Sequence, residues 1–240
     1  MNLKKVIMLG ATGAVGNQAA LQLSKIPQLG QLTLLGRNQA NNIVGEVIQQ
    51  HQVDVCKPDS YCSLLQGHEI AICTLGVGQP SKMSKQAFVE IDKIAVLDFA
   101  IACKAAGITH FQLLSSVGAS AASRSFYLRS KGELEDALKA LNFERLSLFQ
   151  PSMIITPKNR YGLSQALFLK FMPLLDPLLI GSINKFRSIA VDRLGKAIAF
   201  NVYTEYADIN KIETLHWADF ITLSRNINNL ENSIVTNQRV

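Results

Sequence analysis

Cysteine is scarce in this chain, and its cysteines and histidines form no pattern that binds a metal. The cysteines, Cys56, Cys62, Cys73 and Cys103, include no C-x-x-C pair, and the 4 histidines are dispersed along 240 residues. Structural zinc sites need closely spaced pairs of these residues. We therefore expect no metal site and no disulfide framework. Free thiols are typical of a reducing compartment, so the sequence predicts a cytoplasmic protein.

The chain also lacks an apolar run long enough and uninterrupted enough to predict stable insertion in a membrane. The nearest candidate, residues 163–183, contains Pro173 and Pro177 and carries the charges of Lys170 and Asp176. A bilayer helix rarely accepts such residues. We interpret this segment as an apolar lid or pocket wall, and peripheral contact with a membrane is the alternative.

Aromatic residues are few, at 7% of the chain with a single tryptophan, and no dense basic stripe is present. Lysine and arginine number 24 against 18 acidic residues, which gives a formal net charge of +6. These basic residues occur as singles and pairs, unlike those of a nucleic-acid-binding surface. We expect no nucleic-acid partner. Arg187 is interpreted as an exposed basic residue and Trp217 as a core residue.

Strand and helix patterns alternate along the chain, and no linker or internal repeat divides it. The patterns predict strands at residues 5–9, 31–35, 47–55, 69–75, 109–115, 144–150 and 211–216, and helices at 14–25, 58–65, 84–106 and 126–141. This order predicts an α/β fold, a Rossmann doubly wound parallel sheet of about seven strands with a small C-terminal lid region. We expect one domain over residues 1–240, with a cofactor-binding core over 1–150, a substrate or lid portion over 151–225 and a tail over 226–240.

A glycine-rich segment directly follows the first predicted strand and precedes an amphipathic helix. A strand that breaks at a glycine and restarts as a helix is the phosphate-binding corner of dinucleotide folds. The first glycine permits a tight turn, the second lets a pyrophosphate approach, and the third lets the helix pack on the strand. The helix N-terminus then faces the anion. The residues assigned to this corner are Gly10, Thr12, Gly13, Ala14, Val15 and Gly16.

A second group of polar residues surrounds the end of the predicted fifth strand. Ser115 and Ser116 end that strand, at the sheet edge where ligands bind in such folds. Tyr127 and Lys131 are four residues apart on the next predicted helix, so they share one face. A lysine ammonium favours a nearby phenolate, and a serine hydroxyl can hold a substrate oxygen. Together these groups are suited to transferring a proton beside a hydride carrier.

With these motifs the chain resembles the short-chain dehydrogenase/reductase superfamily in its atypical NAD(P)-binding branch, and is similar to the Tat-interactive oxidoreductase-like proteins. The resemblance rests on residues 113–119 and 127–135 and extends over nearly the whole chain. It implies that Ser116 polarises the substrate, that Tyr127 is the general acid/base, and that Lys131 binds the ribose and activates the tyrosine. Ser115 is the alternative for the first role.

The resemblance also bears on a further member of the proton relay. Relatives often place an asparagine on the helix that follows the fourth strand, and the corresponding stretch of this chain offers Asp92 instead. Ser116 also precedes Tyr127 by a short loop.

Further cofactor contacts are expected at the ends of the other strands. Arg37 follows the second strand, and residues 31–44 contain no acidic residue. Because an arginine there accommodates the extra phosphate of NADP, we expect NADP(H) to be preferred over NAD(H), with a solvated arginine as the alternative. Asp54 resembles the residue that faces the adenine, or is an acid at the start of a helix. The remaining expected contacts, including a proline turn beside the nicotinamide, are Val55, Leu75, Gly76, Pro151, Ser152 and Met153.

These observations predict an NADP(H)-dependent oxidoreductase that acts on an unidentified, partly apolar carbonyl or alcohol. The alternative is a regulatory protein that senses NADPH with little or no catalysis. A sugar-nucleotide epimerase ranks last, because the roughly 90 residues after Pro151 are few for its C-terminal domain. A homodimer is an open expectation.

Overall fold

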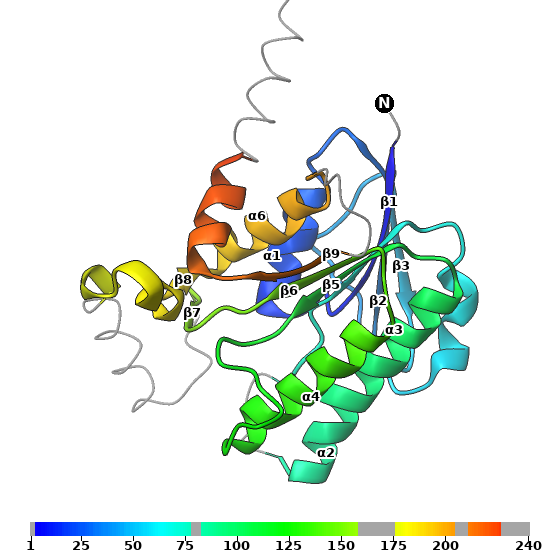
Figure 1. Cartoon of the computed structure of the whole chain (residues 1–240). Coiled ribbons are helices and arrows are strands. Elements are labelled where there is room, and N and C mark those ends of the chain that lie inside the picture. Colours follow the sequence, from blue (N-terminus) through cyan, green and yellow to red (C-terminus); the bar gives the residue numbers. More distant parts are fainter. Residues whose placement is uncertain (1–2, 78–82, 158–175, 205–210, 227–240) are drawn as a thin grey trace, which may run out of the picture.

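The computed structural model describes residues 3–77, 83–157, 176–204 and 211–226. Its centre is a seven-stranded sheet in the order β3-β2-β1-β4-β5-β6-β9, with every pair of neighbours parallel (Figure 1). The strands are β1 (Lys4–Leu9), β2 (Leu29–Gly36), β3 (Ile48–Gln52), β4 (Ile70–Cys73), β5 (His110–Leu114), β6 (Arg145–Phe149) and β9 (Lys211–Leu215). The predicted Rossmann-type α/β fold is confirmed.

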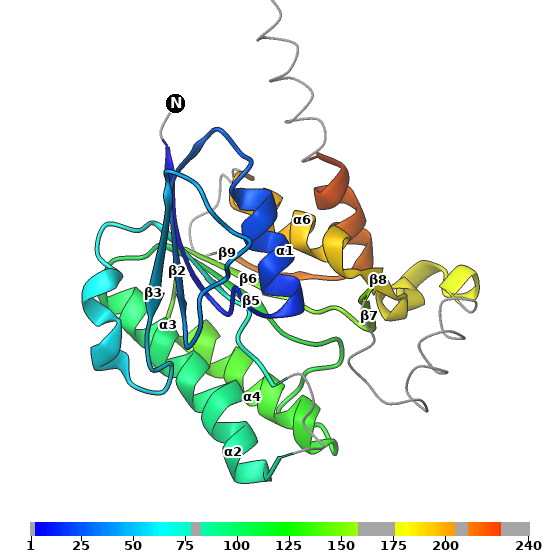
Figure 2. The ribbon, with the colours of Figure 1, turned by 180° about the vertical axis from the view of Figure 1, so that it is seen from behind.

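Helices cover both faces of this sheet. On one face lie α1 (Ala14–Leu23), α6 (Val191–Asn201) and a helical segment over residues 217–226; on the other lie α2 (Lys85–Val89), α3 (Ala95–Ala105) and α4 (Phe126–Ala140) (Figures 1 and 2). Two apolar cores result, one for each face. Along β1, Val6 and Met8 point into the first core, while Ile7 and Leu9 point into the second. Alternation along a strand buried on both faces explains its continuous apolar run.

Two of the four predicted helices differ from the expectation. The segment 58–65 forms two 3-10 turns, η1 (Pro58–Ser60) and η2 (Cys62–Leu64), rather than an α-helix. They are separated by Tyr61, whose φ of −140° is not helical. The long helix predicted over 84–106 contains a π-helical turn, η4 (Glu90–Ile94), between α2 and α3.

The part of the chain after β6 holds elements that the sequence patterns did not predict. These are α6, two short 3-10 segments, η5 (Asp176–Leu178) and η6 (Gly181–Phe186), and a small parallel pair, β7 (Ile154–Ile155) with β8 (Ile189–Ala190). Strands of two residues show no periodicity. Helix α6 contains Gly195, which lowers helix propensity but permits close packing: a Cβ there would lie 2.5 Å from the Cβ of Gln18 on α1.

The four cysteines are free thiols, as expected. Cys73 and Cys103 are buried in the core between the sheet and the α3–α4 layer. Burial raises the pKa of Cys73 to about 12, so this thiol is neutral and behaves as an apolar side chain.

The edge strand β9 is held to β6 by a buried polar network around Glu213. The Glu213 carboxylate pairs with the Arg145 guanidinium at 2.7 Å and accepts hydrogen bonds from Ser147 at 2.5 Å and Asn201 at 3.2 Å. Although burial raises the pKa of Glu213, these hydrogen bonds and the arginine charge outweigh it, so the pKa lies below its usual value. The ionised carboxylate therefore stabilises the folded state.

Glu213→Gln is expected to lower the free energy of unfolding by about 1.5–3 kcal/mol at neutral pH, because it removes charge-assisted hydrogen bonds. Since the pKa is lower in the folded than in the unfolded chain, the contribution is fully present above the unfolded value of about 4.3 and is lost as the pH falls through the folded value. Denaturant titrations from neutral to acidic pH should show the wild type converging on the variant. A difference that does not change with pH would contradict this account.

Candidate functional site

The glycine corner between β1 and α1 has the shape that a pyrophosphate requires. Gly10 adopts φ +100°, and a Cβ there would lie 2.7 Å from the Leu75 nitrogen. A Cβ on Gly16 would overlap the Gly10 carbonyl and the Thr74 hydroxyl. The Gly13 N–H closes the turn on the Gly10 carbonyl at 3.0 Å, and α1 begins directly afterwards. The N–H groups of a helix start with no carboxylate in its first turn are suited to an anion, so this cradle fits the diphosphate of a dinucleotide.

Residues expected to contact the rest of the cofactor follow the strands that flank this corner. Arg37 is exposed directly after β2, and Leu75 and Gly76 follow β4 with Thr74 in between. Because parallel strands end at one edge, all three lie at the edge where the corner is. Thr12 is exposed within the corner itself. This arrangement is the one that the sequence predicts for a cofactor edge.

Asp54 and Val55, the candidate cofactor residues in the loop after β3, have mainly structural contacts. The Asp54 carboxylate accepts the N–H of Cys56 at 3.1 Å and pairs with Lys57 at 3.3 Å, so it shapes the turn before η1. The alternative interpretation places Asp54 at the start of a helix; it lies instead in the turn before the 3-10 segment η1, whose N-cap is Lys57. The Val55 side chain is buried in the α3–α4 core, which leaves only its backbone to face a ligand.

A side-chain pair that the sequence did not reveal links the corner to the loop after β2. Asn17 on α1 and Asn42 in the loop after β2 exchange two amide hydrogen bonds, at 2.9 and 3.0 Å. Asn17 also donates to the Ala11 carbonyl at 3.4 Å. The pair joins the loop that carries Arg37 to the glycine corner. Neither asparagine belongs to a recognisable motif, because the contact depends on how two loops meet.

Tyr127 and Lys131 share one face of α4. That face packs against α2 and the π-helical turn η4. The Lys131 ammonium lies 3.0 Å from the Asp92 carboxylate, and the two side chains are only 5% and 3% exposed. The second Asp92 oxygen accepts the N–H of Val77, just beyond β4, at 2.7 Å. The half-buried Tyr127 ring packs against Phe88, with 5.8 Å between ring centroids. The residue at the expected relay position is therefore the ion-pair partner of Lys131.

This ion pair determines the charge state of Lys131. Burial alone would lower the pKa of its ammonium, but the Asp92 carboxylate, and to a smaller extent Tyr127, raise it above its ordinary value. Lys131 is therefore a buried cation with a carboxylate partner and a phenol nearby.

The two candidate serines have different surroundings. The Ser115 hydroxyl is buried and donates to the Glu135 carboxylate. Ser116 is half-buried at the start of the following loop. Since the Ser115 hydroxyl is already engaged, Ser116 is better placed to meet a substrate oxygen.

The proline turn after β6 lies beside this serine loop. The Val117 N–H donates to the Pro151 carbonyl at 3.0 Å. Ser152 and Met153 are half-buried, and the Met153 carbonyl accepts the N–H of Ile189, which joins the turn to β8 at 2.9 Å. The turn expected beside the nicotinamide therefore adjoins the serine expected to hold the substrate.

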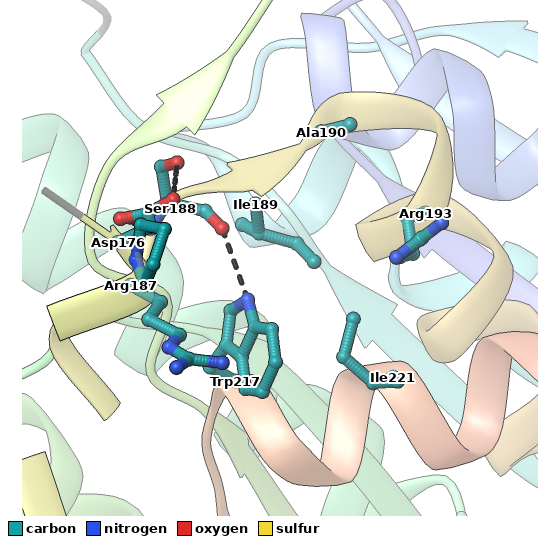
Figure 3. A pocket seen from close by; sticks show the side chains of 9 residues that line it. Asp176, Arg187, Ser188, Ile189, Ala190, Arg193, Trp217 and Ile221 are labelled. Atoms are coloured by element: carbon teal, nitrogen blue, oxygen red, sulfur yellow. Dashed lines mark hydrogen bonds between the residues drawn. The ribbon is translucent and has the colours of Figure 1, made fainter. Parts of the chain in front are cut away.

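A separate pocket of about 510 Å³ lies between η5, β8, the start of α6 and the segment 217–226 (Figure 3). Trp217 forms one wall, and its indole N–H donates to the Ser188 carbonyl at 3.0 Å. The Arg187 guanidinium stacks 4.6 Å from the centre of the indole ring. Arg187 is thus half-buried rather than exposed. Trp217 is also half-buried: it packs against the first core and forms a wall of the pocket.

The predicted lid falls mostly outside the described residues, since only 176–183 of the segment 163–183 are described. That part forms η5 and the start of η6. Among the described ranges, no helix has the length and apolar character needed to cross a membrane.

The Lys131–Asp92 pair leads to a prediction about stability. Asp92→Ala is expected to lower the free energy of unfolding by about 3–5 kcal/mol, because it leaves a buried ammonium without its partner. Adding Lys131→Met removes that charge and should recover most of the loss. Because the pKa of Lys131 is raised, the effect is present throughout neutral pH and disappears only above the unfolded value of about 10.4. Urea unfolding at neutral pH measures it. A double variant as unstable as Asp92→Ala would disprove this account.

Comparison with known proteins identifies relatives along most of the chain. A family model described as NAD(P)H-binding matches residues 10–147. Protein HTATIP2 of Rattus norvegicus is 35% identical over 178 residues, which span 71% of this chain and 71% of that protein. Protein FMP52, mitochondrial, of Meyerozyma guilliermondii is 30% identical over 156 residues, 63% of this chain and 65% of that protein.

Solved structures agree on the fold. The oxidoreductase ylbE from Lactococcus lactis has a TM-score of 0.64 at 18% identity, covering 88% of this chain and 90% of that chain. UDP-N-acetylglucosamine 4-epimerase from Methanobrevibacter ruminantium has a TM-score of 0.66 at 15% identity, covering 90% and 77%. Such identities show the fold alone. The family-model match over more than half of the chain and the similarity to HTATIP2 show that the chain belongs to the NAD(P)H-binding family and is related to HTATIP2.

Proposed function

We propose that this protein is an NADP(H)-dependent oxidoreductase that interconverts a partly apolar carbonyl compound and its alcohol. The observation that carries the proposal is the buried ammonium of Lys131. This side chain lies on the same face of α4 as Tyr127 and is paired with Asp92. A binding protein needs no phenol beside a buried cation at the ligand edge of its sheet. Groups of this kind are arranged where a proton moves.

Each residue has a distinct part in the proposed reaction. When bound, the nicotinamide supplies or accepts the hydride. In the reducing direction Tyr127 donates its hydroxyl proton to the carbonyl oxygen, and Ser116 holds that oxygen with a hydrogen bond. Lys131 holds the ribose of the cofactor and favours the phenolate that Tyr127 becomes. Asp92 fixes the ammonium in place through the 3.0 Å ion pair.

The proposed preference for NADP(H) depends on Arg37. Its exposed side chain follows β2 at the cofactor edge, and residues 31–44 supply no carboxylate to bind a ribose hydroxyl there. A guanidinium can instead bind the 2′-phosphate with two parallel hydrogen bonds.

Arg37→Ala is expected to weaken NADPH binding by about tenfold or more, because charge-assisted hydrogen bonds to a phosphate contribute about 1.5–3 kcal/mol. NADH binding should stay unchanged, since NADH lacks that phosphate. Calorimetric titration of both cofactors measures the effect. Arg124→Ala, which removes another exposed arginine, is the matched control. Equal losses for both cofactors would contradict the proposed preference.

Tyr127→Phe is expected to lower turnover by about 10²- to 10⁴-fold while leaving NADPH affinity nearly unchanged, because it removes only the proton that the general acid donates. Reduction of a panel of aldehydes, ketones and quinones, followed at the nicotinamide absorbance, first identifies a usable substrate. Tyr61→Phe is the matched control, since the buried Tyr61 hydroxyl has no hydrogen-bond partner among the described residues.

The outcome also separates this proposal from its alternative. If no member of the panel is turned over, and NADPH binding alone alters a partner-binding signal that Tyr127→Phe leaves intact, the protein is an NADPH sensor instead.

A further inference from the structure

Helix α4 places one more ionisable side chain in line with Tyr127 and Lys131. Glu135 lies one turn beyond Lys131 on the same face and is only 4% exposed. Its carboxylate accepts the Ser115 hydroxyl, and its two oxygens accept the Gln150 amide at 2.9 and 3.0 Å. Both donors directly follow strands of the sheet: Ser115 comes after β5 and Gln150 comes after β6.

The connection continues to a third strand. The Gln150 side-chain oxygen lies 3.2 Å from Nε2 of His216, which follows β9. The Gln150 backbone N–H also donates to the Leu215 carbonyl at 2.9 Å. One carboxylate on α4 therefore joins the carboxyl ends of β5 and β6 directly, and reaches the end of β9 through Gln150.

Burying this carboxylate is costly, and the described ion pairs give it no cation: the nearby Lys131 is paired with Asp92. Only hydrogen-bond donors offset the loss of its hydration. An acceptor-only group also dictates the orientation of its neighbours. Gln150 must turn its NH₂ toward Glu135, and Ser115 must direct its O–H toward the same carboxylate.

These contacts fix the residues on both sides of Ser116. Before it, the Ser115 N–H donates to the Phe149 carbonyl at 2.7 Å and its hydroxyl is held by Glu135. After it, the Val117 N–H donates to the Pro151 carbonyl at 3.0 Å, in the turn that begins next to Gln150. Ser116 thus lies between two held neighbours, Ser115 and Val117. Glu135 bonds directly to the side chain of Ser115. It also bonds to Gln150, the residue before the Pro151 whose carbonyl accepts the Val117 N–H.

We propose that Glu135 is a positioning residue of the oxidoreductase site, which orients Ser116 and the Pro151 turn by holding Ser115 and Gln150. This inference rests on the proposed function, because Ser116 and Tyr127 are the groups that it aligns. Glu135 itself touches neither substrate nor cofactor in this role. Its effect is on the geometry in which the substrate oxygen meets Ser116 and Tyr127.

The pairing suggests a swap experiment. Glu135→Gln sets an NH₂ group against the NH₂ group of Gln150 or breaks the bond from Ser115. Combining it with Gln150→Glu exchanges carboxylate and amide, so that each donor again meets an acceptor. Glu133→Gln is the matched control, because Glu133 lies on the same helix but pairs at its surface with Lys93. Ser115→Ala removes a single donor and is the milder variant if Glu135→Gln does not fold.

For the panel substrate, Glu135→Gln should lower kcat by about 10- to 100-fold, as expected for misaligned reacting groups, with NADPH affinity within about twofold of wild type. Ser115→Ala should lower kcat less, the swap should restore most of it, and Glu133→Gln should leave it unchanged. Each variant is measured for kcat, KM, NADPH affinity and urea unfolding.

A loss of stability with unchanged kcat would overturn the proposal, as would a swap that restores stability but not kcat. The proposed function fails separately, if Tyr127→Phe retains turnover. Loss of turnover in Tyr127→Phe together with full turnover in Glu135→Gln and Ser115→Ala would reject the positioning role alone.

Discussion

Helix α1 packs so closely on the sheet and on the neighbouring α6 that two of the contacts leave no room for a side chain. On the sheet side, a Cβ at Gly16 would overlap the Gly10 carbonyl and the Thr74 hydroxyl. On the other side, Gly195 of α6 presses against Gln18 and Ala19. The first contact sets the start of α1 at the carboxyl ends of β1 and β4, where its N–H groups form the anion cradle. The second brings the C-terminal part of the chain against the cofactor-binding half.

The strands could be predicted because both sheet faces are covered. A strand such as β1 buries Val6 and Met8 on one side and Ile7 and Leu9 on the other, so it appears in the sequence as an unbroken apolar run. The 3-10 turns at 58–65 could not be separated from a helix, because the apolar spacing is similar over so few residues. Helix α6 was missed because its interior glycine, needed for packing on α1, counts against a helix in any local scale.

The candidate site, like the fold, could be predicted from the sequence only in part. Tyr127 and Lys131 could be paired from their spacing, since residues four apart on a helix share a face. The resemblance points to Asp92 at the relay position but not to its ion pair with Lys131, and no pattern singles out Glu135. Both residues take part through contacts between elements distant in sequence. The choice between Ser115 and Ser116 likewise depends on which hydroxyl is bonded to Glu135. Local sequence patterns do not identify the partner that such a side chain binds. A carboxylate on an otherwise apolar face does indicate that a buried partner exists.

The π-helical turn η4 lies within one continuous helix that serves two surfaces. Before the turn, Phe88 packs on Tyr127; within it, Asp92 meets Lys131; beyond it, Val96 and Phe99 fill the core. A π turn holds one residue more than an α turn, and each residue of an α-helix advances by about 100°. Removing a residue here would rotate the ligand-facing end against the core-facing end by that amount. The number of residues in this turn therefore sets the angle between the ligand-facing and core-facing ends of the helix.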